Sequence, residues 1–207
     1  MTMSFGIQRL AMCTAVLSLL LAGTGCGGPG SAHQGALADA AQEVAQGLSA
    51  LDGLNLDSLA ASQKRVATRF KDLNWLMADS SLTFSLEDGQ LIGDWARVKR
   101  YLKGTPQKVD LLKEQGEVCR TQLEGLRDAI RSRAKVDGMG QAMDEGYFDN
   151  QARRELDAYN AWKSACDDTQ RYIRLGMETE QSTLAKMDSL ILAKRAEWAQ
   201  QIAQGDA

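Results

Sequence analysis

The sequence predicts an all-α fold, an elongated antiparallel bundle of about three long helices preceded by a short N-terminal helix. Composition is the first reason: the 207 residues include only two prolines, and Ala, Leu, Gln, Glu, Lys and Arg dominate over β-branched residues, as in helical proteins. Periodicity is the second reason. Apolar residues recur at steps of three, four or seven over long stretches, which is the pattern of one helical face.

The first long helix is predicted over residues 59–102. Its face consists of Leu59, Val66, Phe70, Leu73, Met77, Phe84, Leu91, Trp95, Val98 and Leu102. Residues 80–93 leave an alternative open, because residues 82–86 alternate between apolar and polar and Asp88-Gly89 is a hairpin turn signal, so a small β-hairpin or a helix break could interrupt the helix. Gly104 then ends it, and Thr105-Pro106 predicts a tight turn into the next helix.

The second long helix is predicted over residues 109–130 from a stricter heptad, which Asp137-Gly138-Met139-Gly140 interrupts. The third begins after Gly146 and, if continuous to about Gln204, is roughly 85 Å long at 1.5 Å per residue. Heptad spacing over such lengths favours an elongated antiparallel bundle. A short helix over residues 36–51, ended by Gly53, completes a predicted bundle domain of residues 36–207.

The first 25 residues have the features of an export signal. They contain no acidic residue and one basic residue, Arg9, followed by an apolar run from Leu10 to Ala22. This run is too short to span a bilayer, which requires roughly 20 apolar residues. A short charged segment followed by such a run is typical of a signal peptide.

The end of this segment, Leu21-Ala22-Gly23-Thr24-Gly25-Cys26, resembles the lipobox of bacterial lipoprotein precursors, although Gly23 stands where such boxes usually carry Leu. The resemblance implies that Cys26 is acylated, with palmitate among the chains, and becomes the first residue of the mature protein. The alternatives are an ordinary secretory signal or an uncleaved anchor. Residues 26–35, rich in small side chains, are predicted to be the lipidated cysteine and a flexible tether.

The resemblance also implies a cellular location. We expect a lipid-anchored protein of the cell envelope. By the sorting habit of lipoproteins, the non-acidic Gly27 favours the outer membrane, facing the periplasm or the surface, in a host with two membranes.

The four cysteines suggest a disulfide. Cys13 leaves with the leader and Cys26 takes the lipid, so Cys119 and Cys166 remain in a compartment that is usually oxidising. If the second and third helices fold back between residues 142 and 143, these two cysteines lie at equal distances from that point. The sequence therefore predicts a Cys119–Cys166 disulfide. The alternative is two buried free thiols or a redox switch.

The sequence lacks the residues that several kinds of catalytic and binding site require. The only histidine is His33, so the predicted bundle cannot hold a Ser-His-Asp triad, a Cys-His pair or a multi-histidine metal site. No phosphate-binding or dinucleotide-binding glycine motif occurs. A net charge of −3 without a basic patch gives no reason to expect nucleic-acid binding. We predict no catalytic residue, no metal and no cofactor.

Acidic pairs are the only remaining candidates for catalysis or metal binding. They are Glu87-Asp88, Asp144-Glu145, Asp167-Asp168 and Glu178 with Glu180. They are predicted to be solvated helix faces with neighbouring basic partners, because none has the spacing of a calcium loop.

Three functions follow from these observations. The first is a non-enzymatic, lipid-anchored bundle that contacts the membrane through its lipid and binds another envelope protein, for which Trp75 and Trp162 could serve as exposed contacts if they are not core residues. The alternative is a module that binds a small or apolar ligand between helices, lined by Met77, Met139, Met143, Met177 and Met187. The third, a hydrolase using paired carboxylates, has the least support.

Overall fold

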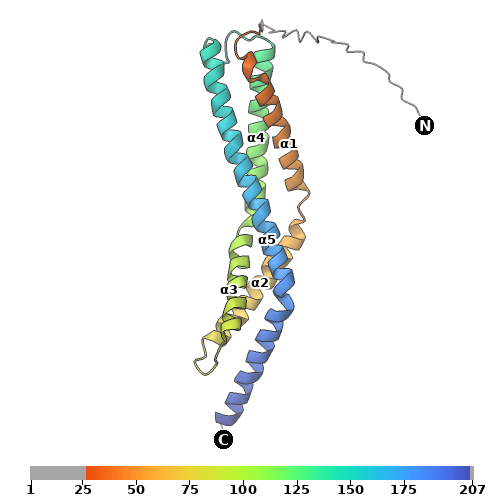
Figure 1. Cartoon of the computed structure of the whole chain (residues 1–207), viewed down its shortest axis with the longest axis vertical. Coiled ribbons are helices and arrows are strands. Elements are labelled where there is room, and N and C mark those ends of the chain that lie inside the picture. Colours follow the sequence, from red (N-terminus) through yellow and green to blue (C-terminus); the bar gives the residue numbers. More distant parts are fainter. Residues whose placement is uncertain (1–26, 206–207) are drawn as a thin grey trace, which may run out of the picture.

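The computed structural model describes residues 27–205, and within that range it contains five α-helices and one short 3-10 helix (Figure 1). The helices are η1 (Ser31–His33), α1 (Gln34–Asp52), α2 (Leu56–Met77), α3 (Leu86–Leu102), α4 (Thr105–Arg131) and α5 (Glu145–Gly205). The predicted all-α class and elongated antiparallel bundle are confirmed. Cys26 and the predicted leader lie outside the described residues.

Helix α5 organises the bundle. It has 61 residues, which corresponds to about 90 Å. Helices α1 and α4 pack against its N-terminal half, and α2 and α3 pack against its C-terminal half (Figure 1). The chain therefore runs along the bundle three times, through α1 and α2, back through α3 and α4, and forward again through α5.

The prediction of one continuous helix over residues 59–102 is wrong, and the alternative of a helix break is confirmed. The chain reverses between Met77 and Leu86, because Ser85 caps a new helix: its hydroxyl accepts a hydrogen bond from Asp88 N, and Asp88 accepts one from Ser85 N at 2.8 Å. The predicted alternative of a β-hairpin is also wrong, since Asp88-Gly89 lies in the first turn of α3. The apolar spacing continues through the break because α2 and α3 both pack against α5.

The predicted short connection at Gly104 is present, since α3 ends at Leu102 and α4 begins at Thr105, but it does not reverse the chain as expected. Helices α3 and α4 pack against successive parts of α5, so the chain bends at Lys103-Gly104 without reversing direction. Gly104 has a φ of 65°, which glycine adopts at little cost. Thr105 is the first residue of α4, and its hydroxyl donates to Leu102 O at 2.8 Å. At this bend the Leu102 side chain packs onto Gly176, where an added Cβ would lie 2.6 Å from Leu102 Cδ2.

The other helices begin and end close to the predicted residues. Helix α1 ends before Gly53, and α5 begins after Asp144, which accepts a hydrogen bond from Tyr147 N at 2.8 Å. The N-terminal segment differs from the expected tether. Residues 30–35 belong to the bundle end, where Gly30 N donates to Glu145 Oε2 at 2.9 Å and His33 Nε2 lies 2.7 Å from Asp149 Oδ1.

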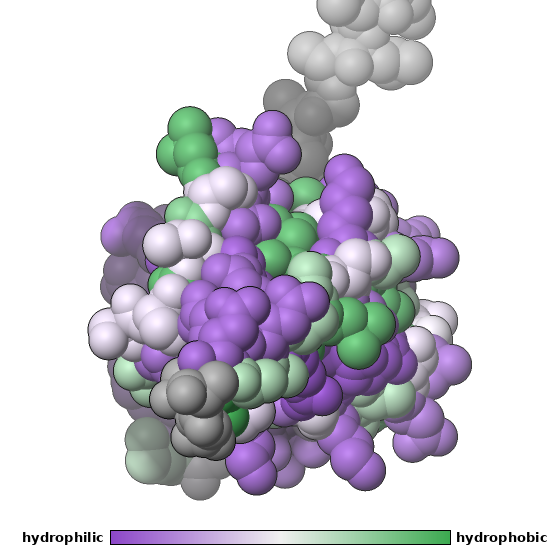
Figure 2. Space-filling model, turned by 90° about the horizontal axis from the view of Figure 1, so that it is seen from below, coloured by the Kyte–Doolittle hydropathy of each residue, from purple (hydrophilic) through white to green (hydrophobic). Residues whose placement is uncertain are grey.

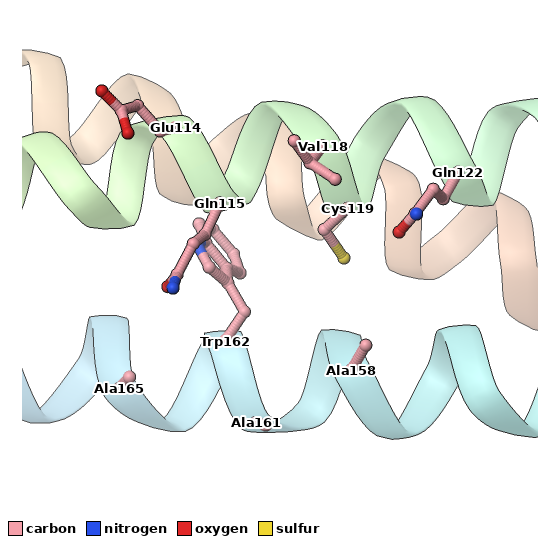
Figure 3. Close-up of a pocket in the computed structure, with 9 residues that line it drawn as sticks. All are labelled: Glu114, Gln115, Val118, Cys119, Gln122, Ala158, Ala161, Trp162 and Ala165. Atoms are coloured by element: carbon pink, nitrogen blue, oxygen red, sulfur yellow. The ribbon is translucent and has the colours of Figure 1, made fainter.

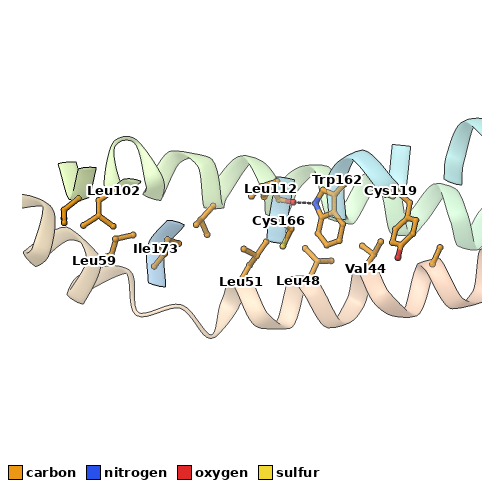
Figure 4. Packing of buried hydrophobic residues seen from close by; sticks show 14 of the residues in the cluster. Val44, Leu48, Leu51, Leu59, Leu102, Leu112, Cys119, Trp162, Cys166 and Ile173 are labelled. Atoms are coloured by element: carbon orange, nitrogen blue, oxygen red, sulfur yellow. Dashed lines mark hydrogen bonds between the residues drawn. The ribbon is translucent and has the colours of Figure 1, made fainter. Parts of the chain in front are cut away.

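Trp162 joins three helices at one level of the bundle (Figure 4). Its Nε1 donates to Leu112 O of α4 at 2.8 Å, and the side chain is 6% exposed. The ring fits because two neighbouring helices carry glycine there: a Cβ at Gly47 of α1 would lie 2.6 Å from Trp162 Cη2, and one at Gly116 of α4 would lie 2.9 Å from Cζ2. We call this contact of Trp162 with Gly47 and Gly116 the Trp162 slot. Trp162 is thus a core residue.

Trp75, the other tryptophan proposed as an exposed contact, lies near the C-terminal end of α2. Trp75 is 51% exposed and meets Trp198 edge to face, with ring centroids 4.8 Å apart. Trp198 Nε1 donates to Asp79 Oδ2 at 3.0 Å, which ties the end of α2 to α5. Seen from this end, the surface is mostly hydrophilic with separate hydrophobic patches (Figure 2).

The Trp162 slot predicts that glycine-to-alanine substitutions change the free energy of unfolding in opposite directions, depending on whether the glycine contacts Trp162. Gly47→Ala and Gly116→Ala should each lower the free energy of unfolding by about 1–2 kcal/mol, because overpacking outweighs the gain in helix propensity. Gly125→Ala is the matched control: it lies in α4 with nothing within 4 Å of an added Cβ, and it should stabilise by about 0.5–1 kcal/mol. Urea unfolding measures all three. Stabilisation by Gly47→Ala would contradict the slot.

Candidate functional site

Cys119 and Cys166 are buried free thiols, so the predicted disulfide is wrong. The cause is the register of the two helices. The connection over residues 132–144 is centred near Gly138, where Asp137 N donates to Gln141 O at 2.9 Å, and not between residues 142 and 143. Cys119 is therefore level with residues 157–158, and Cys166 lies about 13 Å farther along α5. Trp162 lies between the two cysteines along the bundle (Figure 4).

The environment of both thiols makes them poor nucleophiles. Burial raises the pKa of Cys119 and of Cys166 above the ordinary value, so the thiolate is scarce at neutral pH. A thiolate is the reactive form in disulfide exchange and in metal binding. The structure therefore favours the free-thiol alternative and gives no support to the redox switch.

An open groove of about 600 Å³ runs between α4 and α5 (Figure 3). Its α5 wall consists of Ala158, Ala161 and Ala165, and Trp162 and Cys119 also line it. The α4 wall consists of Glu114, Gln115, Val118 and Gln122.

The chemistry of this α4–α5 groove is apolar. Val118 is 57% exposed, and Leu111, two turns before it on α4, is 51% exposed. Glu114 is the only charged residue in the lining, although a quarter of the chain is charged. Exposed apolar side chains beside a depression are a common sign of a contact surface. No signal in the sequence predicted this groove, because the alanines of α5 look like ordinary surface residues.

The acidic pairs have structural partners. Asp168 pairs with Arg171 at 3.0 Å, Asp88 caps α3, and Glu145 accepts from Gly30 N. Across residues 27–205, no group of three or more His, Cys, Asp or Glu side chains lies close enough to hold a metal ion.

Glu180 is the most buried carboxylate of the bundle, with 3% of its side chain exposed. Ser62 Oγ donates to it at 2.8 Å, and Arg65 donates through Nε at 2.5 Å and Nη2 at 2.9 Å. Burial raises the pKa of Glu180, but the hydrogen bonds from Arg65 and Ser62 outweigh burial and hold the pKa below the ordinary value. Glu180 is therefore ionised and holds α2 against α5.

A second polar contact holds α1 against α5. Tyr159 Oη donates to Glu43 Oε2 at 2.6 Å, and Lys163 Nζ lies 3.1 Å from the same oxygen. Burial and the acceptor Glu43 raise the pKa of Tyr159 to about 12, so the phenol stays protonated. This contact positions α1 against α5, the helix that forms one wall of the groove.

The methionines do not form a common lining. Met187 is fully buried and Met143 is 9% exposed, whereas Met77 is 42% and Met139 is 91% exposed. They lie on α2, in the connection after α4 and on α5, and none lines the α4–α5 groove. This distribution gives no support to the ligand-binding alternative.

Among the described helices, none is long and apolar enough to cross a membrane. Comparisons of the chain with protein-family models, with curated proteins and with solved structures find no match.

Glu180 predicts a pH-dependent contribution to stability. Glu180→Gln should lower the free energy of unfolding at pH 7 by about 1.5–3 kcal/mol, because Arg65 loses its charged partner. A lowered folded-state pKa stabilises the protein above the unfolded pKa, and this stabilisation is lost as pH falls through the folded value. The difference between wild type and variant should therefore shrink below about pH 4.3, the ordinary glutamate pKa.

Glu178→Gln is the control for this measurement, since Glu178 lies on the same helix but is exposed. It should change the free energy of unfolding by less than about 0.5 kcal/mol. Equal effects of the two substitutions in urea unfolding would show that the buried ion pair contributes nothing specific.

Proposed function

We propose that the chain is a non-enzymatic lipoprotein of the bacterial cell envelope, which is anchored through Cys26 and binds another envelope protein in the α4–α5 groove. The signal-like residues 1–25 and the lipobox-like residues before Cys26 support the anchor. Both bundle thiols are buried with raised pKa values, and Asp88, Glu145, Asp168, Glu180 and Tyr159 are each engaged in a contact within the bundle, which supports a role in binding.

The docked N-terminal segment determines where such an anchor would attach. Gly30 packs against Phe148 and Ile130 at the end of the bundle, and its N–H is bonded to Glu145. Cys26 is four residues earlier, a distance of at most about 14 Å of extended chain. An anchor at Cys26 therefore holds one end of the bundle at the membrane, while the other end can extend about 90 Å from it.

The groove itself is the observation that carries the binding function. Alanine side chains on α5 allow a partner helix to approach closely, as small residues do wherever helices pack. The exposed Val118 offers an apolar contact on the opposite wall. An amphipathic helix from a partner protein fits these properties, because such helices place their apolar face in an apolar groove.

Intact mass spectrometry of the membrane-extracted protein tests the anchor. We expect a chain that begins at Cys26 and carries a glyceryl group with two or three acyl chains. Alkylation in denaturant without reduction should modify both Cys119 and Cys166, since both are free thiols in the structure. An unlipidated chain would contradict the anchor, and alkylation only after reduction would contradict the free thiols.

Site-specific photo-crosslinking in cells tests the groove. A photo-reactive amino acid at position 118 should capture one envelope protein, whereas the same residue at position 86, which is 80% exposed on α3, should not. Ala161→Glu places a charge in the groove and should reduce capture at least about tenfold, since burying an unpaired charge is costly. Ser164→Glu, exposed on the same helix, should leave capture unchanged. Equal capture in both variants would exclude the groove.

A further inference from the structure

We propose that the connection between α4 and α5, residues 132–144, is a second membrane contact that inserts its apolar tip among the headgroups of an anionic phospholipid bilayer. We call this segment the α4–α5 loop. The inference depends on the proposed anchor, because the anchor is what brings this end of the bundle to the membrane.

The tip of the loop exposes apolar side chains in a fixed conformation. Met139 is 91% exposed and Val136 is 59% exposed. Asp137 Oδ1 accepts hydrogen bonds from Met139 N and Gln141 N, each at 2.9 Å, and Met143 N donates to Lys135 O at 2.9 Å. The backbone of the loop is thus closed by its own hydrogen bonds while the Met139 side chain extends into solvent. Exposed apolar side chains of this kind partition into the membrane interface.

Basic side chains flank the apolar tip. Arg133 and Lys135 are exposed, and neither forms a salt bridge with another residue of the described chain. Arg131 pairs with Asp128 at 3.3 Å. Arg133 also has a φ of 53°, in the left-handed region that favours glycine, so a cationic side chain occupies a costly backbone position.

Acidic groups also lie at this end. Asp137 closes the loop, Asp144 accepts from Tyr147 N, Glu145 accepts from Gly30 N, and Asp149 pairs with His33. Each of them accepts a hydrogen bond from another group, and none forms a salt bridge with Arg133 or Lys135, so these two cations remain available for lipid phosphates. Cations near an anionic bilayer surface are attracted to it.

The N-terminal segment places the loop next to the membrane. A Cβ on Gly28 would lie 3.5 Å from Arg133 Cγ, so the chain leaves the bundle beside the base of the loop. The connection between α4 and α5 lies at the same end as the start of the described chain (Figure 1). With Cys26 two residues before Gly28, a lipid anchor and the loop would meet the same patch of bilayer.

Fluorescence quenching in reconstituted vesicles tests this contact. The protein, purified from bacterial membranes in the N-terminal form that cells produce, is placed in phosphatidylethanolamine and phosphatidylglycerol vesicles with a fluorophore on Met139→Cys. Phospholipids brominated close to the headgroup should quench it. The same fluorophore on Leu86→Cys, at the far end, should not be quenched. Labelled wild type reports any background from Cys119 and Cys166, which are buried.

A charge variant tests the contribution of the basic residues. Arg133→Gln with Lys135→Gln should lower the ratio of inserted to free loop about 25-fold, since each cation near an anionic surface contributes about fivefold. The ratio should change little in neutral phosphatidylcholine vesicles. Lys64→Gln with Lys71→Gln, two exposed lysines of α2, should leave it unchanged.

The outcomes separate this inference from the proposed function. A vesicle-bound, lipidated protein whose label at position 139 is unquenched would overturn the loop contact and leave the anchor intact. An unlipidated protein that does not bind vesicles would overturn both. Quenching that is equal at positions 139 and 86 would show that the bundle lies flat, which also contradicts the inference.

Discussion

The Trp162 slot is the contact on which the rest of the structure depends. Its indole lies between Gly47 and Gly116 and donates to Leu112 O, so it fixes the level at which α1, α4 and α5 meet. That level determines which residues of α4 and α5 line the groove and separates the two cysteines along the bundle. It also brings the start of α1 and the connection after α4 to the same end, where an N-terminal anchor and the α4–α5 loop can act together.

Helix α5 also provides a polar contact to each of three partner helices. Glu180 binds Arg65 of α2, Thr183 accepts from Trp95 Nε1 of α3 at 2.8 Å, and Tyr159 donates to Glu43 of α1. An apolar heptad seam permits neighbouring registers, because its side chains are similar along the helix. Hydrogen bonds between particular buried groups favour one register, since a shifted helix would leave them without partners.

Helices that end at a glycine or begin at a cap could be predicted from the sequence, and α1, α4 and α5 were predicted well for this reason. The break between α2 and α3 was predicted only as an alternative, because the same apolar spacing continues through both helices. They share a face toward α5 and look continuous. Ser85 and Asp88 carried the signal of the break, because a serine three residues before an acidic residue starts a helix. The disulfide failed because its register depended on an assumed loop centre, although Asp137-Gly138 marks the true one. Gly47 and Gly116 were the available signal for the Trp162 slot. Glycine inside a helix lowers the stability of that helix, so its presence there indicates close packing by another side chain.

The register of α4 against α5 is therefore the central claim, and distances between spin labels test it most directly. Pulsed electron resonance on Val118→Cys with Ala158→Cys, and on Val118→Cys with Asp167→Cys, both without the native bundle cysteines, gives two distances to compare. The structure predicts the shorter distance for positions 118 and 158, which face each other across the groove, because position 167 lies about 13 Å farther along α5. A shorter distance between positions 118 and 167 would contradict the register, and with it the groove and the shared end of the bundle.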